Sequence, residues 1–175
     1  MTLGTFFLAS VFGVLTQLIF QKDLLLITSL IILFIVVLIG VIFDTIGTAA
    51  AAATIPPLNA KAARREEGAR KAVELVKNAD RVANFCNDVI GDITGVISGG
   101  IAAVIIYQLF AHSSPGSDFY PRIILTAMVA ALTVGGKAWG KYIALRKSTE
   151  ILLKIGFILT RLEKIRFKRS NMKKK

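Results

Sequence analysis

The sequence has little of the chemistry that enzymes and small secreted domains use. It contains one cysteine and one histidine in 175 residues, so a single chain can form neither a disulfide nor a thiolate metal cluster by itself. Cys86 lies in an apolar context and is interpreted as a packing residue, and His112 as a solvated loop residue. Because no nucleophile stands beside a base in this pattern, we expect no enzyme.

Charge is also missing over long stretches. Charged residues make up 19% of the chain and hydrophobic residues 54%, and the charges gather in a few blocks, whereas a soluble domain of this size would scatter them. The run from Leu24 to Phe43 carries no charge. Its length of about 20 residues, at about 1.5 Å each, matches the roughly 30 Å of hydrocarbon in a bilayer. The pattern predicts an all-α integral membrane protein with three core transmembrane helices, an N-terminal apolar helix and basic amphipathic juxtamembrane helices.

Three segments are expected along the chain. Residues 1–23 form an apolar segment that either spans the bilayer or lies at its interface. A signal peptide is the rival interpretation, but the segment lacks a basic start and an A-x-A-like cleavage site. Residues 24–144 form the transmembrane module, and residues 145–175 a basic cytoplasmic juxtamembrane helix and tail. Within the module we expect spans over 24–54, 82–111 and 120–142 and a helical loop over 55–81, whose amphipathic part runs from Lys61 to Arg81.

The net charge of +11 is explained by topology. Basic residues flank the apolar spans without the interleaved aromatic residues of a nucleic-acid platform, so we expect no nucleic-acid partner. The basic loop 55–81 and the basic tail should face the cytoplasm, and the 112–120 loop, which has almost no positive charge, should lie outside. We therefore expect a plasma (inner) membrane protein whose C-terminal helix rests on an anionic leaflet.

Acidic residues within or beside the spans are the first candidates for function. A charge there costs at least a few kcal/mol and is usually kept for an ion path or a partner, which applies to Asp44, Asp88 and Asp92. Asp88 and Asp92 are four residues apart and should project from one helical face. With Asn84 and Asn87 they offer oxygen ligands that suit a hard cation such as magnesium. In the alternative interpretation they are wetted residues of the headgroup zone.

Lys137 and a row of glycines complete the candidates. Lys137 lies in an otherwise uncharged stretch, where it either pairs with an aspartate of the preceding span or snorkels toward the headgroups near Trp139. Gly91, Gly95 and Gly99 repeat every four residues and would let a second backbone approach closely. This repeat predicts a homodimer.

Three stretches resemble the transmembrane module of the cyclin M (CNNM) and CorB/CorC magnesium-transporter family, over roughly residues 24–165. The family has a small-polar pattern at the end of its first span, a Gly-Asn-x-x-x-Asn-like pattern at the start of its second, and Gly-Glu-Ile-x-Pro-Lys before Ile-Ala-Leu-Arg-like residues in its third. The matching stretches are Phe43-Asp44-Thr45-Ile46-Gly47-Thr48-Ala49-Ala50 before Arg64-Arg65-Glu66-Glu67-Gly68, Asn87-Asp88-Val89-Ile90-Gly91-Asp92, and Gly136-Lys137-Ala138-Trp139-Gly140-Lys141 before Ile143-Ala144-Leu145-Arg146.

The resemblance implies a dehydrated magnesium ion as substrate, held at positions that match Thr45, Asp88, Asp92 and Lys137. The family's glutamate is replaced here by Lys137, and a fixed ammonium repels a divalent cation. Two hypotheses follow: a divergent divalent-cation transporter, or a non-transporting membrane scaffold or partner subunit whose ion site is closed by a Lys137–aspartate ion pair. The nucleotide-binding domains that usually follow this module are not in the sequence, so no ATP control is expected.

Overall fold

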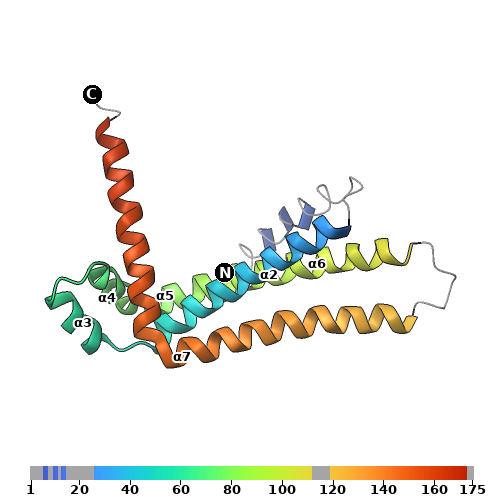
Figure 1. The fold of residues 1–175 in the computed structure, drawn as a ribbon, viewed down its shortest axis with the longest axis horizontal. Helices are drawn as coiled ribbons and strands as arrows, with labels where there is room; N and C mark the ends of the chain where they lie inside the picture. The colour runs from blue at the N-terminus through green and yellow to red at the C-terminus, as the bar shows by residue number, and fades with distance from the viewer. Residues whose placement is uncertain (1–5, 8–9, 12, 15–25, 112–118, 173–175) are drawn as a thin grey trace. The chain divides into compact units, whose positions relative to one another are not determined.

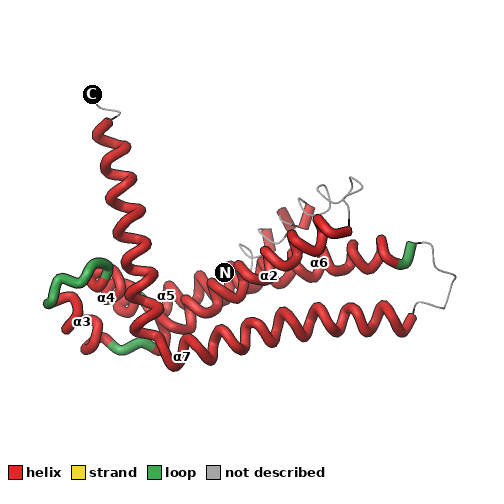
Figure 2. The backbone as a smooth tube through the Cα atoms, viewed as in Figure 1, coloured by secondary structure: helices red, strands yellow, loops and turns green. Residues whose placement is uncertain are grey.

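Every regular element that the structure describes is a helix (Figures 1 and 2). The computed structural model describes residues 6–7, 10–11, 13–14, 26–111 and 119–172. The described residues before Val14 are helical and mostly exposed, which agrees with an apolar N-terminal helix. The expected outside loop, 112–118, lies outside the described residues. The elements in chain order are α2 (Leu26–Ala52), α3 (Ile55–Ala63), α4 (Ala69–Lys77), α5 (Ala79–Ala83), the π-helix η1 (Asn84–Gly91), α6 (Asp92–Leu109) and α7 (Phe119–Met172).

Three of these helical stretches are long and apolar enough to cross a bilayer. They cover Leu26–Ala52, Ala79–Leu109 and Phe119–Ile165. Large apolar side chains on them are exposed, among them Phe34 at 60% and Met128 at 63%. Because an aqueous surface would not tolerate so much apolar area, these side chains are suited to lipid. The chain is an all-α integral membrane protein, as the sequence predicted.

The chain divides into two compact units, and each draws on two separate parts of the sequence. The membrane unit comprises 1–44 and 87–140, and the charged unit comprises 45–86 and 141–175. In the membrane unit, Leu33 and Val37 of α2 pack against Ile101 and Ile105 of α6. Near the start of α7, the Arg122 guanidinium donates a hydrogen bond to the Phe110 carbonyl at 3.2 Å. This bond joins the beginning of α7 to the chain just after α6.

The core of the charged unit is built of small residues. It comprises Ala49, Ala50, Leu58, Ala72, Ala144 and Leu152. Pro56 and Pro57 stand in the first turn of α3, where proline removes no intrahelical hydrogen bond. They allow the chain to start a new helix soon after α2 ends.

Two glycines of the charged unit set how closely α4 approaches α7. Gly68 has φ of +88°, in the left-handed region that other residues rarely adopt. A Cβ on Gly156 would meet the Gly68 carbonyl oxygen and would lie 2.9 Å from the Ala72 backbone nitrogen. The helix predicted over Lys61–Arg81 is interrupted twice: over residues 64–68, where Arg65 and Gly68 have positive φ, and again at Asn78.

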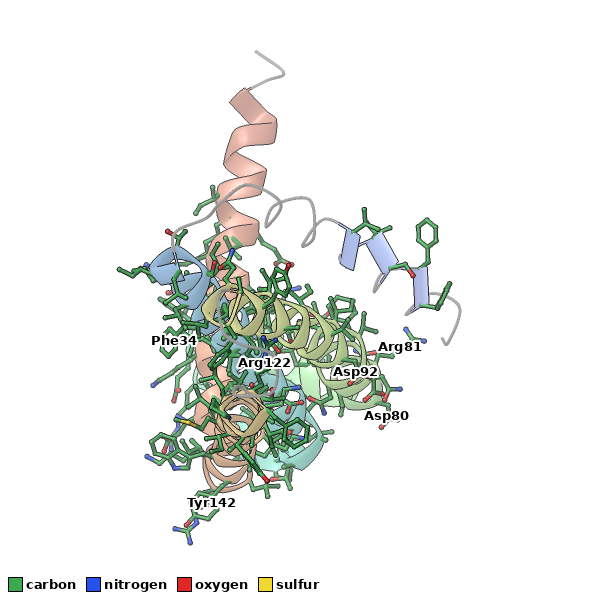
Figure 3. All side chains as sticks on the ribbon, turned by 90° about the vertical axis from the view of Figure 1, so that its right-hand side faces the viewer. Phe34, Asp80, Arg81, Asp92, Arg122 and Tyr142 are labelled. Carbon is green, nitrogen blue, oxygen red and sulfur yellow. The ribbon has the colours of Figure 1, made fainter. Side chains whose placement is uncertain are left out.

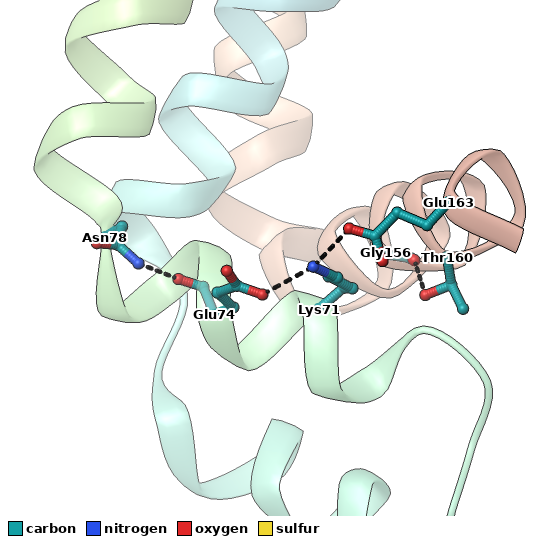
Figure 4. Close-up of polar contacts among 6 residues, drawn as sticks. All are labelled: Lys71, Glu74, Asn78, Gly156, Thr160 and Glu163. Carbon is teal, nitrogen blue, oxygen red and sulfur yellow. Dashed lines mark hydrogen bonds and ion pairs between the residues drawn. The ribbon is translucent and has the colours of Figure 1, made fainter. Parts of the chain in front are cut away.

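Two ion pairs connect the chain around Gly68 with the C-terminal part of α7. The Lys71 ammonium lies 2.8 Å from a Glu163 carboxylate oxygen and 3.1 Å from one of Glu74 (Figure 4). The hydrogen bond to Glu163, and then that to Glu74, raises the pKa of Lys71 above its ordinary value. Lys164 donates a hydrogen bond of 2.6 Å to Glu67 and so lowers the pKa of the Glu67 carboxyl. All these groups keep solvent access, so each pair contributes little to stability.

α7 is two helical stretches joined at Lys147. There φ is −125° and ψ is 30°, outside the helical range. The interruption lies close to the predicted end of the last span and start of the juxtamembrane helix at 144/145. Helical structure continues on both sides of this residue.

Candidate functional site

The end of a π-helix accepts side-chain hydrogen bonds in the membrane unit. η1 is a π-helix, in which hydrogen bonds join residues five apart, and such segments often lie at functional sites. The Thr94 hydroxyl lies 2.9 Å from the carbonyl oxygens of both Ile90 and Gly91. The Lys137 ammonium of α7 donates to the same Gly91 carbonyl at 3.0 Å. The end of η1 therefore accepts hydrogen bonds from a hydroxyl and from an ammonium group.

Gly40 of α2 makes room for these two side chains. A Cβ built on Gly40 would lie 2.5 Å from the Thr94 hydroxyl oxygen, 3.2 Å from Thr94 Cβ and 3.7 Å from Lys137 Cε. Nearby, a Cβ on Gly136 would lie 3.2 Å from a methyl carbon of Val41. Glycine at these positions lets α2 approach α6 and α7 closely, so that the Lys137 side chain is enclosed by three helices.

Asp44 is a buried acid of the membrane unit. Its exposure is 3%, and α2 carries it one helical turn beyond Gly40. With its amide nitrogen turned toward α2, Asn87 of η1 donates to the Asp44 backbone carbonyl and to the side-chain oxygen Oδ1, each at 3.2 Å. A hydrogen-bonded carboxylate within a span is the kind of group that membrane proteins keep for a function.

The predicted ligands Asp88 and Asp92 are exposed. Both belong to the membrane unit, and Asp92 is labelled in Figure 3. Thr45 belongs to the charged unit and is half-buried. Within the described ranges, no group of three or more histidine, cysteine, aspartate or glutamate residues is placed to hold a metal ion.

Lys137 is half-buried and bonded to a backbone carbonyl. Two placements were open from the sequence: an ion pair with an aspartate of the preceding span, or snorkelling toward the headgroups. Lys137 does reach the preceding helical stretch, as in the first placement, but its partner there is the Gly91 carbonyl and not a carboxylate. Among the described residues it forms no ion pair with Asp88 or Asp92.

Sequence reasoning missed Gly40 and Thr94. Gly40 interrupts a run of large apolar residues in the first span, a signal that could have indicated a close helix approach. Thr94 had no such signal, since threonines in spans commonly bond their own helix carbonyls. Of the predicted glycine row, Gly91 is buried, whereas Gly95 is half-buried and Gly99 exposed. A Cβ on either Gly95 or Gly99 would meet no atom within 4 Å.

The candidate site thus consists of two neighbouring pairs in one unit: Lys137 on the Gly91 carbonyl, and Asn87 on Asp44. It presents an ammonium, a carboxylate and backbone carbonyl oxygen between helices of a membrane protein. No model of a protein family, no curated protein and no solved structure matches this chain.

Proposed function

We propose that this chain is a divergent CNNM/CorC-like membrane protein that carries no magnesium itself, because the Lys137 ammonium takes the place of the cation. The observation that supports this proposal is the 3.0 Å hydrogen bond from Lys137 to the Gly91 carbonyl. In such a protein the closed site holds three helices together, and the chain acts as a membrane scaffold or partner subunit.

Electrostatics supports a closed site. A magnesium ion binds oxygen at about 2.1 Å and would share the Gly91 carbonyl with the ammonium. At a separation of about 4 Å and an effective dielectric constant of about 20, repulsion between a divalent ion and an ammonium is about 8 kcal/mol. That energy equals the whole binding free energy of a ligand with a Kd of about 1 μM. The ion could bind only after Lys137 had moved or lost its proton.

Divalent-cation transport is the second candidate function. It is favoured by the buried carboxylate of Asp44 beside the Asn87 amide, which supplies ligand oxygen inside a span. In this proposal magnesium is the substrate, Thr45, Asp88 and Asp92 contribute further oxygen ligands, and Lys137 releases the carbonyl when the ion enters.

Magnesium-dependent stability separates the two candidates. Purified protein in detergent is unfolded by heat with and without millimolar magnesium at constant ionic strength. A ligand that binds only the folded state stabilises it by about 2.7 kcal/mol at a hundred times its Kd. A closed site predicts no magnesium effect in the parent and a raised midpoint in Lys137→Glu, which restores the family's acid.

Control variants show whether a magnesium effect on stability arises at the Lys137 site. Lys77→Glu makes the same charge change at an exposed lysine of α4 and should remain insensitive to magnesium. A magnesium-dependent rise in the parent that is lost in Asp92→Ala would overturn the closed site and favour transport. The absence of any rise in Lys137→Glu would count against a cation site at this position in either form.

Assembly and orientation belong to the same proposal. The chain forms a homodimer through Gly91, Gly95 and Gly99, lies in the plasma (inner) membrane and keeps loop 55–81 and its C-terminus in the cytoplasm. A Cβ at Gly95 or Gly99 meets no neighbouring atom within 4 Å, so we use Gly95→Leu to test assembly. A dimer in detergent that survives this substitution would contradict the interface.

A further inference from the structure

The C-terminal stretch of α7 has an inner side that packs within the charged unit. Leu152 and Gly156 are buried, and Glu163 reaches Lys71 across to α4. Residues at these spacings lie on one helical face. That face is already occupied, so the residues on the opposite side are not needed for packing in this unit.

The opposite side carries an apolar stripe. Ile158, Leu162 and Ile165 are 50%, 57% and 62% exposed, and their spacing of four and three residues places them in one row. Leu162 stands at the edge of this row and also lines a groove with Lys71 and Glu74 of α4. We call the residues Lys154, Ile158, Arg161, Leu162 and Ile165 the outer face. Three large aliphatic side chains in one exposed row form a surface that water solvates poorly.

Basic groups flank this stripe. Lys154 and Arg161 stand four residues before and three residues after Ile158. Within the described residues Lys154 forms no ion pair, and the Arg161 guanidinium lies 4.7 Å from the centre of the Phe157 ring. The only acid in the sequence from 151 to 175 is Glu163, which Lys71 neutralises on the inner side. The outer face therefore combines apolar and cationic groups with no negative charge.

We propose that the outer face of α7 docks on an anionic phospholipid bilayer, with its aliphatic side chains among the acyl-chain boundary and its basic groups on the phosphates. Amphipathic helices with this pattern bind lipid interfaces through the two effects together. The partner surface is close at hand because the same chain is embedded in a bilayer through its spans, which raises the effective concentration of lipid. Charge complementarity selects lipid with a net negative headgroup over a neutral one.

The expected loss of docking on removal of two basic groups can be calculated. Each basic residue near an anionic surface contributes enough that loss of two lowers the ratio of docked to undocked helix about 30-fold. The attraction is screened over about 3 Å at 1 M salt, compared with about 10 Å at 0.1 M. High salt should therefore weaken docking in the same direction as Lys154→Gln/Arg161→Gln.

The test uses the full chain reconstituted in vesicles. A polarity-sensitive fluorophore is attached to a cysteine at Ile158→Cys in a Cys86→Ala background, and its quenching by aqueous iodide is measured. The vesicles contain phosphatidylcholine alone or phosphatidylcholine with phosphatidylserine. We expect protection from iodide only in the phosphatidylserine vesicles, loss of that protection at 1 M potassium chloride, and its loss in Lys154→Gln/Arg161→Gln.

Two matched controls make the result specific. A fluorophore at Ala63→Cys, an exposed position of α3, should be quenched equally in both kinds of vesicle. Arg70→Gln/Lys77→Gln removes two exposed charges from α4 and should leave the protection at position 158 intact.

Three outcomes would overturn the proposal. One is equal quenching at position 158 in neutral and anionic vesicles. Another is equal loss of protection in the α4 double variant, which would mean that overall charge and not this face attracts the lipid. The third is protection that follows the protein-to-lipid ratio in neutral vesicles, because a second copy of the chain would then cover the stripe.

Discussion

Gly40→Ala adds one methyl group at the point where α2 meets α6. The new carbon would lie 2.5 Å from the Thr94 hydroxyl oxygen and 3.2 Å from Thr94 Cβ, so the helices must separate or Thr94 must leave its rotamer. Overpacking of this kind costs about 1–3 kcal/mol, while the better helix propensity of alanine returns up to about 1 kcal/mol. We expect a net loss of about 1–2 kcal/mol, equivalent to a midpoint lowered by about 2–8 °C for a chain of this size.

The assay is reversible unfolding of the purified protein in mixed micelles, with two comparisons. Gly99→Ala makes the same chemical change where an added carbon meets no atom within 4 Å, and it should not destabilise the protein. Thr94→Ala removes the oxygen nearest to the new methyl group, so a double-mutant cycle should show favourable coupling between Gly40→Ala and Thr94→Ala. The reasoning is refuted if Gly40→Ala is as stable as the parent, or if Gly99→Ala loses as much stability.

Two further predictions concern the charged unit. Gly156→Ala should cost about 3 kcal/mol, at the upper end for overpacking, because the new carbon meets backbone atoms of Gly68 and Ala72 that cannot rotate away; unfolding in mixed micelles measures it, and a parent-like midpoint would contradict it. Acid should also weaken this unit. The Lys164 hydrogen bond lowers the pKa of Glu67, so its contribution is present above the ordinary value of 4.5 and is lost as pH falls through the folded-state pKa. Glu67→Gln should lack this part of the pH dependence, and identical acid profiles for the two proteins would refute the assignment.

The spans could be predicted from the sequence because they depend on local composition. An uncharged run as long as Leu24–Phe43 leaves few alternatives to a membrane helix. Adjacent prolines at 56 and 57 cannot lie inside a continuous helix, and the structure has them in the first turn of α3, after α2 has ended at Ala52. The structure places the first span at Leu26–Ala52, in agreement with both signals.

The candidate site could be predicted only in part. Asp44, Asn87 and Lys137 stood out because polar groups in apolar surroundings need a reason. Their partners could not be predicted from the sequence. Lys137 bonds a backbone carbonyl at the end of η1, and every residue carries such a carbonyl whatever its side chain. The close approach of Gly68 to Gly156 was missed for a similar reason, because the two residues are distant in sequence.

The division of the chain has a consequence for synthesis on the ribosome. The small-residue core of the charged unit joins Ala49, Leu58 and Ala72 to Ala144 and Leu152, so its first half emerges long before its second. Elongation from Ala72 to Leu152 adds about 80 residues, which at about 5–20 residues per second takes roughly 4 to 16 seconds. During that interval α3 and α4 have no α7 to pack on, while the membrane segments between them are being inserted. The core of the charged unit therefore cannot close until Leu152 has been synthesised, and a nascent chain halted before Ala144 would present its apolar surface to chaperones or proteases.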